Sequence, residues 1–141
     1  MDGTNPFSYP RLIQPLLDKH CVTCHAKPGS KAPVLGKDPV DKPAAGWIHP
    51  DKGFSQSYLN LVPKYGFYRY PEPLETTPGK FGARVAPLYA LLTKGHHGVN
   101  LTPEELHRFT VWLDAGSPFY GVYEQAGGEA QFRGEIARPS L

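Results

Sequence analysis

The chain has 141 residues, and its 15 basic and 13 acidic residues give a formal net charge of +2. This length predicts one domain over residues 1–141, and the nearly balanced charge argues against binding of nucleic acid or of an anionic membrane surface. No run approaches the roughly 20 apolar residues of a membrane-spanning helix. Because 16 prolines and 15 glycines are present, much of the chain is expected to form turns and irregular loops.

The first predicted helix follows a short lead of residues 1–8. Apolar side chains recur at helical spacing from residue 12 to residue 24. Pro15 fits only the first turn of a helix, so the regular helix is expected to begin near residues 12–15 and to end near residue 24. His20 lies on this helix, where we expect it to be packed or hydrogen-bonded.

The end of this helix carries the sequence Cys-Val-Thr-Cys-His at residues 21–25. Two cysteines separated by two residues and followed by histidine form the attachment pattern of c-type haem. Each thiol forms a thioether with one vinyl group of the haem, and His25 supplies an axial ligand to the iron. Cys21 and Cys24 are the only cysteines of the chain. The motif therefore predicts one covalently attached haem c held by Cys21, Cys24 and His25.

Two other readings of the cysteine pair compete with haem attachment. A redox disulfide of the thioredoxin type would need a strand before the motif and a helix after it, and no such frame is predicted. A structural zinc site needs four ligands, usually from two paired clusters, and the chain has no second cysteine pair. Haem attachment is the reading that fits the whole motif.

Regular structure is hard to predict between residues 26 and 86, where most of the prolines lie. Aromatic residues are frequent in the same segment, whereas a disordered linker would be poor in them. We therefore expect an ordered, loop-rich segment that covers one face of the haem. Ser57 to Leu61 are predicted to form one helical turn.

Two further helices are predicted near residues 87–95 and 103–115. A proline begins the first, leucines give it an apolar face, and Gly95 ends it. The second opens with Thr102 as its N-cap and Glu105 three residues later, which is the pattern of a capping box.

After the third helix, residues 119–123 are predicted to be ordered and extended. Residues 127–141 are predicted to form a solvated tail. The expected fold class is all-α and loop-rich, with a long irregular segment between the haem-bearing helix and the helix at 87–95.

The second axial ligand has to come from elsewhere in the chain. The only methionine is Met1, which argues against the histidine–methionine pair of many small cytochromes. His107 is expected to be exposed on the third helix, and His49 lies in a loop with nothing to anchor it. His96 and His97 directly follow a helix whose apolar face points inward. One of these two is the best candidate.

Several short motifs, taken in order, resemble the mono-haem cytochrome c domains common in planctomycete proteins, such as the C-terminal haem domain of the hydrazine synthase alpha subunit. Similar modules are attached to secreted proteins. The resemblance spans residues 10–123. Its motifs are Ile13–Leu17 with the Cys-Val-Thr-Cys-His sequence, Phe54–Tyr58, Pro78–Leu88, Gly95–His97, Trp112–Asp114 and Pro118–Gly121.

The resemblance implies a cytochrome c-like fold with a long irregular insertion and a six-coordinate haem bound by two histidines. His25 matches the proximal ligand and His96 the distal one, with His97 in reserve. Arg84 falls in the segment that approaches the haem, where its guanidinium can pair with a propionate carboxylate; the other reading is a surface cation. The chain has no second haem motif, so nothing supports hydrazine synthesis.

A haem with both axial positions filled predicts electron transfer, because no open position is left for a substrate. An electron-transfer domain is therefore favoured over an enzyme. Its partners would be redox proteins or other domains of the same polypeptide. The alternative is a haem enzyme or small-molecule sensor with a displaceable distal ligand.

Haem is attached to this motif outside the cytoplasm, yet the first five residues lack the basic start and apolar stretch of a signal peptide. We therefore expect the chain to be a domain of a larger exported protein, periplasmic or extracellular.

Overall fold

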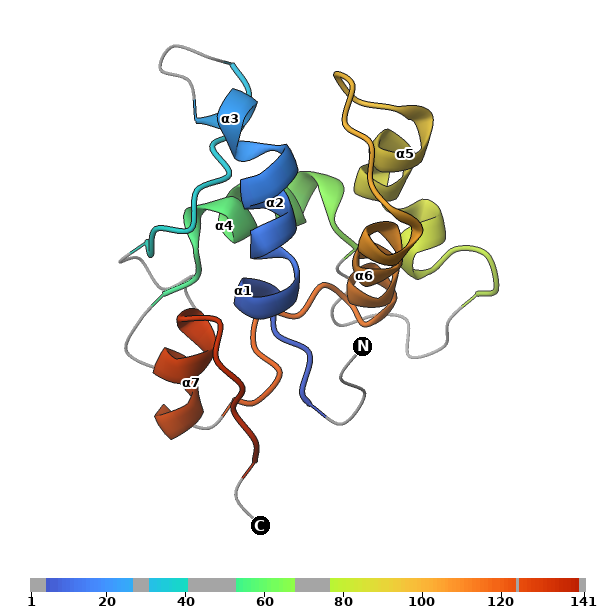
Figure 1. Cartoon of the computed structure of the whole chain (residues 1–141). Helices are drawn as coiled ribbons and strands as arrows, with labels where there is room; N and C mark the ends of the chain where they lie inside the picture. Colours follow the sequence, from blue (N-terminus) through green and yellow to red (C-terminus); the bar gives the residue numbers. More distant parts are fainter. Residues whose placement is uncertain (1–4, 27–30, 41–52, 68–76, 124, 140–141) are drawn as a thin grey trace.

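The computed structural model describes residues 5–26, 31–40, 53–67, 77–123 and 125–139 (Figure 1). Over these residues the fold is helical and loop-rich and contains no β-strand. A single isolated antiparallel bridge between Pro39 and Ser55 is the closest approach to sheet structure in this part of the chain. The all-α prediction is confirmed. None of the helices described is long and apolar enough to cross a membrane.

The helix predicted from residues 12–15 to residue 24 is present as α2 (Gln14–His20) and α3 (Val22–His25), and a further piece, α1 (Tyr9–Leu12), begins before the predicted start. The break at Ile13 has a clear cause, because Pro15 lacks the N–H that would continue the helical hydrogen bonds. The second break falls at Cys21, whose backbone leaves the helical region although its N–H still donates to Leu17 O over 2.8 Å. The three pieces follow one another as a column (Figure 1).

The central segment contains a longer helix than predicted. In place of one turn at residues 57–61, α4 spans Gln56–Tyr65. Ser55 caps its start by accepting a hydrogen bond from Tyr58 N at 3.4 Å. The frequent prolines of this segment led to the prediction of a loop. One of them, Pro63, lies inside the last turn of α4, where burial of Leu61 and Val62 outweighs the lost hydrogen bond.

The two later helices are confirmed close to their predicted bounds. A 3₁₀ turn, η1 (Gly82–Val85), leads into α5 (Pro87–Lys94), and α6 covers Pro103–Asp114. The predicted capping box of α6 is complete: Glu105 N donates to Thr102 Oγ1 at 3.2 Å, and Thr102 N donates to Glu105 Oε2 at 2.9 Å. Gly95 ends α5 with a φ of +91°, a conformation that only glycine adopts easily.

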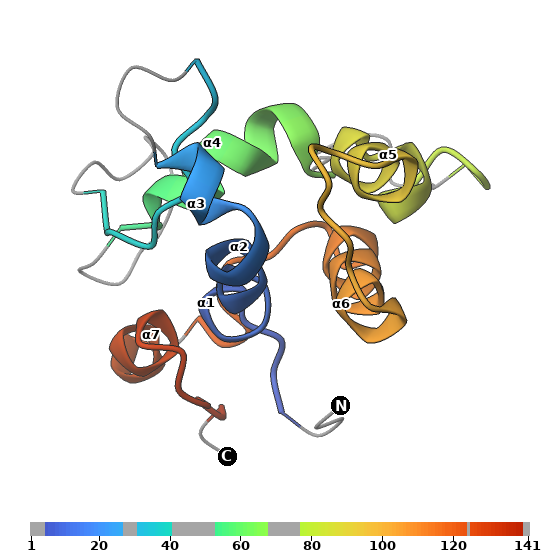
Figure 2. The ribbon, with the colours of Figure 1, turned by 45° about the horizontal axis from the view of Figure 1, so that its top comes forward.

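The prediction of a solvated tail is wrong for residues 127–132, whereas residues 133–139 lie outside the helices and are mostly exposed. Residues 125–132 form α7 (Gln125–Phe132), which lies beside α1 (Figures 1 and 2). Its Gln131 is 1% exposed; its Oε1 accepts from Gly121 N and Val122 N, and its Nε2 donates to Val122 O. A buried polar side chain that is hydrogen-bonded to the backbone does not appear in the hydrophobic pattern of the sequence. This explains the error.

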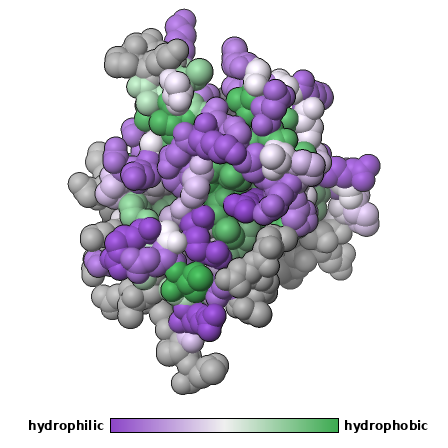
Figure 3. Space-filling view, viewed as in Figure 1, coloured by the Kyte–Doolittle hydropathy of each residue, from purple (hydrophilic) through white to green (hydrophobic). Residues whose placement is uncertain are grey.

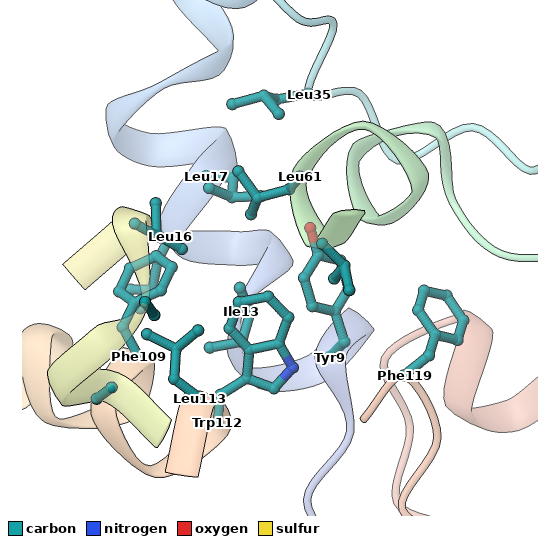
Figure 4. Packing of buried hydrophobic residues seen from close by; sticks show 14 of the residues in the cluster. Tyr9, Ile13, Leu16, Leu17, Leu35, Leu61, Phe109, Trp112, Leu113 and Phe119 are labelled. Carbon is teal, nitrogen blue, oxygen red and sulfur yellow. The ribbon is translucent and has the colours of Figure 1, made fainter. Parts of the chain in front are cut away.

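The core lies where α1 and α2 pack against α6, with α4 alongside (Figure 4). Tyr9 is fully buried, with its ring centroid 5.2 Å from Trp112 and 5.6 Å from Phe119. Above them, Leu16 and Leu17 of α2 reach toward α6 and α4. This core fixes α2 and α6 relative to each other. Next to it, α3 and α5 form the two sides of a cavity.

Candidate functional site

A cavity of about 610 Å³ lies between the α2–α3 column and α5. This volume is within the roughly 300–1,000 Å³ of typical ligand and cofactor pockets. Apolar surface lines the indentation between α3 and α5 (Figure 3). The apolar lining from the helices consists of Leu17, Leu61, Leu88, Leu91, Leu92 and Phe109.

The cysteines and histidines that were predicted to form the site line this cavity on two sides. Cys21, Cys24 and His25 line one side, and His96 and His97 line the other. Neither cysteine forms a disulfide; Cys21 is half-buried and Cys24 is exposed. Side chains about 70 positions apart in the chain therefore share one apolar pocket.

His25 is held in a defined orientation. It follows Cys21 by one helical turn, and its N–H donates to Cys21 O at 3.0 Å. Its Nδ1 lies 2.8 Å from Pro33 O, a carbonyl that can only accept, so Nδ1 carries the proton. In the neutral ring the other nitrogen, Nε2, is then the unprotonated one and can bind a metal.

His96 lies close to His25 in the lining of the cavity. The two ring centroids are 6.0 Å apart and the ring planes differ by 39°. Two imidazoles bonded to opposite sides of one metal ion at about 2 Å each place their centroids roughly 6 Å apart. Burial, and then the neighbouring His97 and His25, lower the pKa of His96 below its ordinary value, which favours the neutral imidazole that a metal requires.

His97 lies beside His96 and makes a poorer counterpart to His25. Its ring is 4.5 Å from that of His96 and nearly perpendicular to it. The side chain is exposed, and the backbone has a φ of +48°, a strained conformation for a residue with a Cβ. Of the two adjacent histidines, His96 is the one that stands in ring contact with His25.

The thiol of Cys21 differs from the nucleophile of a redox disulfide. Burial raises the pKa of Cys21 to about 11, and the nearby Cys24 adds to the increase. Thioredoxin-type cysteines show the opposite shift, because the reactive thiolate has to be stabilised. The electrostatics of the motif therefore give no support to disulfide exchange.

Among the described residues, no three histidine, cysteine, aspartate or glutamate side chains are arranged to hold a metal ion directly. What the cavity lining offers is a pair of imidazoles, those of His25 and His96, with centroids 6.0 Å apart. Such a pair suits a metal whose remaining ligands come from a cofactor.

The other predicted site residues have different positions. Arg84 is exposed on η1 and is not among the residues that line the cavity, so its contact with a propionate stays a prediction. His20 is hydrogen-bonded to Glu105, with Nε2 3.1 Å from Oε1, as expected. His107 is exposed, as expected. His49 lies outside the described residues.

Sequence reasoning missed the carbonyl of Pro33 and the contacts that Lys19 and His20 make with Glu105. Pro33 acts through its backbone oxygen, which every residue type possesses, so no sequence signal could have found it. Glu105 was recognised as a helix cap, but its contacts with α2 depend on how α2 and α6 pack. Comparison of the chain with protein-family models, with curated proteins and with solved structures finds no match.

Proposed function

We propose that the cavity binds one haem c, attached covalently through Cys21 and Cys24, with His25 and His96 as axial ligands. The observation that carries this proposal is the pair of imidazoles, 6.0 Å apart, in an apolar cavity that both cysteines also line. The proposal includes a cytochrome c-like fold and kinship with the mono-haem domains that the sequence resembles. His97 is kept as the reserve ligand.

The lining of the cavity suits a porphyrin. Its leucines and Phe109 offer apolar surface to a large flat ring, and burial of such a ring is favourable. The hydrogen bond from His25 Nδ1 to Pro33 O fixes the ring and increases the basicity of Nε2, as is usual for histidine ligands of metals. Both features support the assignment of His25 as the proximal ligand.

We further propose that the protein transfers electrons. Bound haem would supply an iron that alternates between its ferric and ferrous forms, and two histidine ligands leave no open position for a substrate. Exchange would take place with a redox protein or with another domain of the same polypeptide. Haem attachment to this motif places that exchange in the periplasm or outside the cell.

The proposal is tested by producing the chain together with a c-type haem maturation system. The haem should resist acid–organic extraction and give a pyridine haemochrome of the two-thioether type, and the ferric protein should be low-spin. A Cys21→Ser/Cys24→Ser variant is the matched control and should release its haem on extraction. Extractable haem in the wild-type protein, or none at all, overturns the proposal.

A second function is favoured by the position of His96. It lies outside any helix, in a turn flanked by Gly95 and Gly98, and its neighbour His97 also lines the cavity. A ligand on such a turn can leave the iron more readily than one on a helix, and this would suit a haem enzyme or small-molecule sensor. Rapid carbon monoxide binding by the reduced wild-type protein would favour this reading; slow or no binding favours electron transfer.

A further inference from the structure

We infer that Glu105 is a positioning residue that ties the turn carrying His96 to the helix carrying the haem-attachment motif. This inference rests on the proposed function, because it assigns Glu105 the task of keeping His96 opposite His25. Glu105 touches neither histidine, so it would act only through the segments that bear them.

One carboxylate group bridges two parts of the chain that are far apart in sequence. Its Oε1 accepts from Lys19 Nζ at 2.8 Å and from His20 Nε2 at 3.1 Å, both at the end of α2. Its Oε2 accepts from Thr102 N at 2.9 Å, at the end of the turn that leads into α6. Glu105 is buried, with 8% of its surface exposed, although glutamate is rarely buried unless it is paired.

The two bridged segments lead directly to the two sides of the cavity. His20 immediately precedes Cys21, the first cysteine of the motif. On the other side, Thr102 follows His96 by six positions, and the intervening turn is closed by a hydrogen bond from Val99 N to His96 O at 2.9 Å. A displacement of Thr102 relative to His20 would therefore change the spacing of the two axial ligands.

Glu105 also has an ordinary structural role, as the third residue of the α6 capping box. The two roles share the hydrogen bond from Thr102 N to Oε2, but only the bridge uses Oε1, so they can be separated. Glu105→Gln preserves the capping pattern, since glutamine also serves at this position, but it removes the charge that attracts Lys19. Thr102→Ala removes the hydroxyl that caps α6 and leaves the carboxylate bound to α2.

The experiment measures the rate at which carbon monoxide binds to the reduced, haem-loaded protein. In a six-coordinate haem this ligand binds only after the distal histidine leaves, so the rate reports how firmly His96 is held. We expect Glu105→Gln to increase the rate about tenfold, from the loss of hydrogen bonds to a charged group, while Thr102→Ala stays within about twofold of wild type. Equal rates for wild type and Glu105→Gln, or equal increases in both variants, overturn the inference.

A second measurement needs no haem. Backbone amide exchange of the haem-free chain should accelerate across residues 95–102 in Glu105→Gln, whereas in Thr102→Ala the effect should stay within the first turn of α6. Unchanged exchange over residues 95–102 in Glu105→Gln contradicts the positioning role. If the wild-type chain took up no haem, the proposed function would fail, and the exchange result would still decide whether Glu105 holds the turn.

Discussion

The two sides of the cavity hold their histidines by different means. On the α3 side, Cys21, Cys24 and His25 lie within one helical turn, and Pro33 O fixes the ring of His25. On the α5 side, His96 lies on a turn outside any helix, between residues whose φ values are positive. The first arrangement is local and anchored by a hydrogen bond, whereas the second depends on turn conformation and on tertiary contacts. We therefore expect the His96 side to be the more easily displaced.

The largest effect is expected from the firmly held side. His25→Ala removes the ligand that is built into the attachment motif, and we expect the yield of haem-loaded protein to fall on the order of tenfold or more. The yield is measured from the haem absorbance per mole of purified chain. His20→Ala, which alters the adjacent helix end, is the matched control and should retain haem. Equal yields for His25→Ala and wild type would contradict the proposed proximal role.

A smaller effect is expected from substitution of His96, which should change the spin state of the iron and leave the haem attached. His96→Ala should keep the covalent haem but convert the ferric protein at least partly from low-spin to high-spin and admit carbon monoxide after reduction. Optical and paramagnetic resonance spectra measure both changes. His97→Ala is the control and should remain low-spin, because the ring of His96 is the one that lies close to that of His25. The reverse result would move the distal ligand to His97.

The turn itself can be strained without touching a ligand. Gly95 has a φ of +91°, and a Cβ added there would meet no atom within 4 Å, so Gly95→Ala would act through backbone strain alone. The cost should be about 1–3 kcal/mol, seen as a lower unfolding temperature and faster carbon monoxide binding. Gly36→Ala is the control, since Gly36 does not lie at a positive φ. Equal unfolding temperatures for the two variants would show that the turn tolerates a side chain.

The sequence predicted best the features that depend on residues close together in the chain. The bounds of α5 and α6, the capping box and the grouping of Cys21, Cys24 and His25 follow from short-range rules of helix geometry and from a motif. Contacts between segments far apart in the chain could not be predicted from the sequence. α4 was underestimated because burial outweighed Pro63, and α7 was missed because Gln131 is buried by hydrogen bonds to the backbone. For the site, the residues alone nominated His96 or His97 and the resemblance favoured His96; in the structure the ring of His96 lies 6.0 Å from that of His25.

The smallest expected effect is on the stability of the fold at acid pH, and it tests the carboxylate of Glu105 that joins the two sides of the cavity. Hydrogen bonds from Lys19, from the Thr102 backbone and from His20 lower the pKa of Glu105 from 4.5 to about 2. A carboxyl group whose pKa is lower in the folded state stabilises the fold above its unfolded pKa, and this stabilisation is lost as the pH falls from about 4.5 toward 2. Glu105→Gln lacks the group and has no such dependence.

We therefore expect wild type to exceed Glu105→Gln in stability by about 1–2 kcal/mol at pH 7, and the difference to shrink steadily below pH 4.5. Urea unfolding of both haem-loaded proteins at matched pH values measures it, and protonation of the axial histidines affects both alike. Glu104→Gln is the control, because Glu104 is exposed and pairs with Arg108 on its own helix, 2.8 Å away. This control should lie close to wild type at every pH. A difference between wild type and Glu105→Gln that stayed constant from pH 7 to pH 3 would show that the ionised carboxylate does not join the two sides of the cavity.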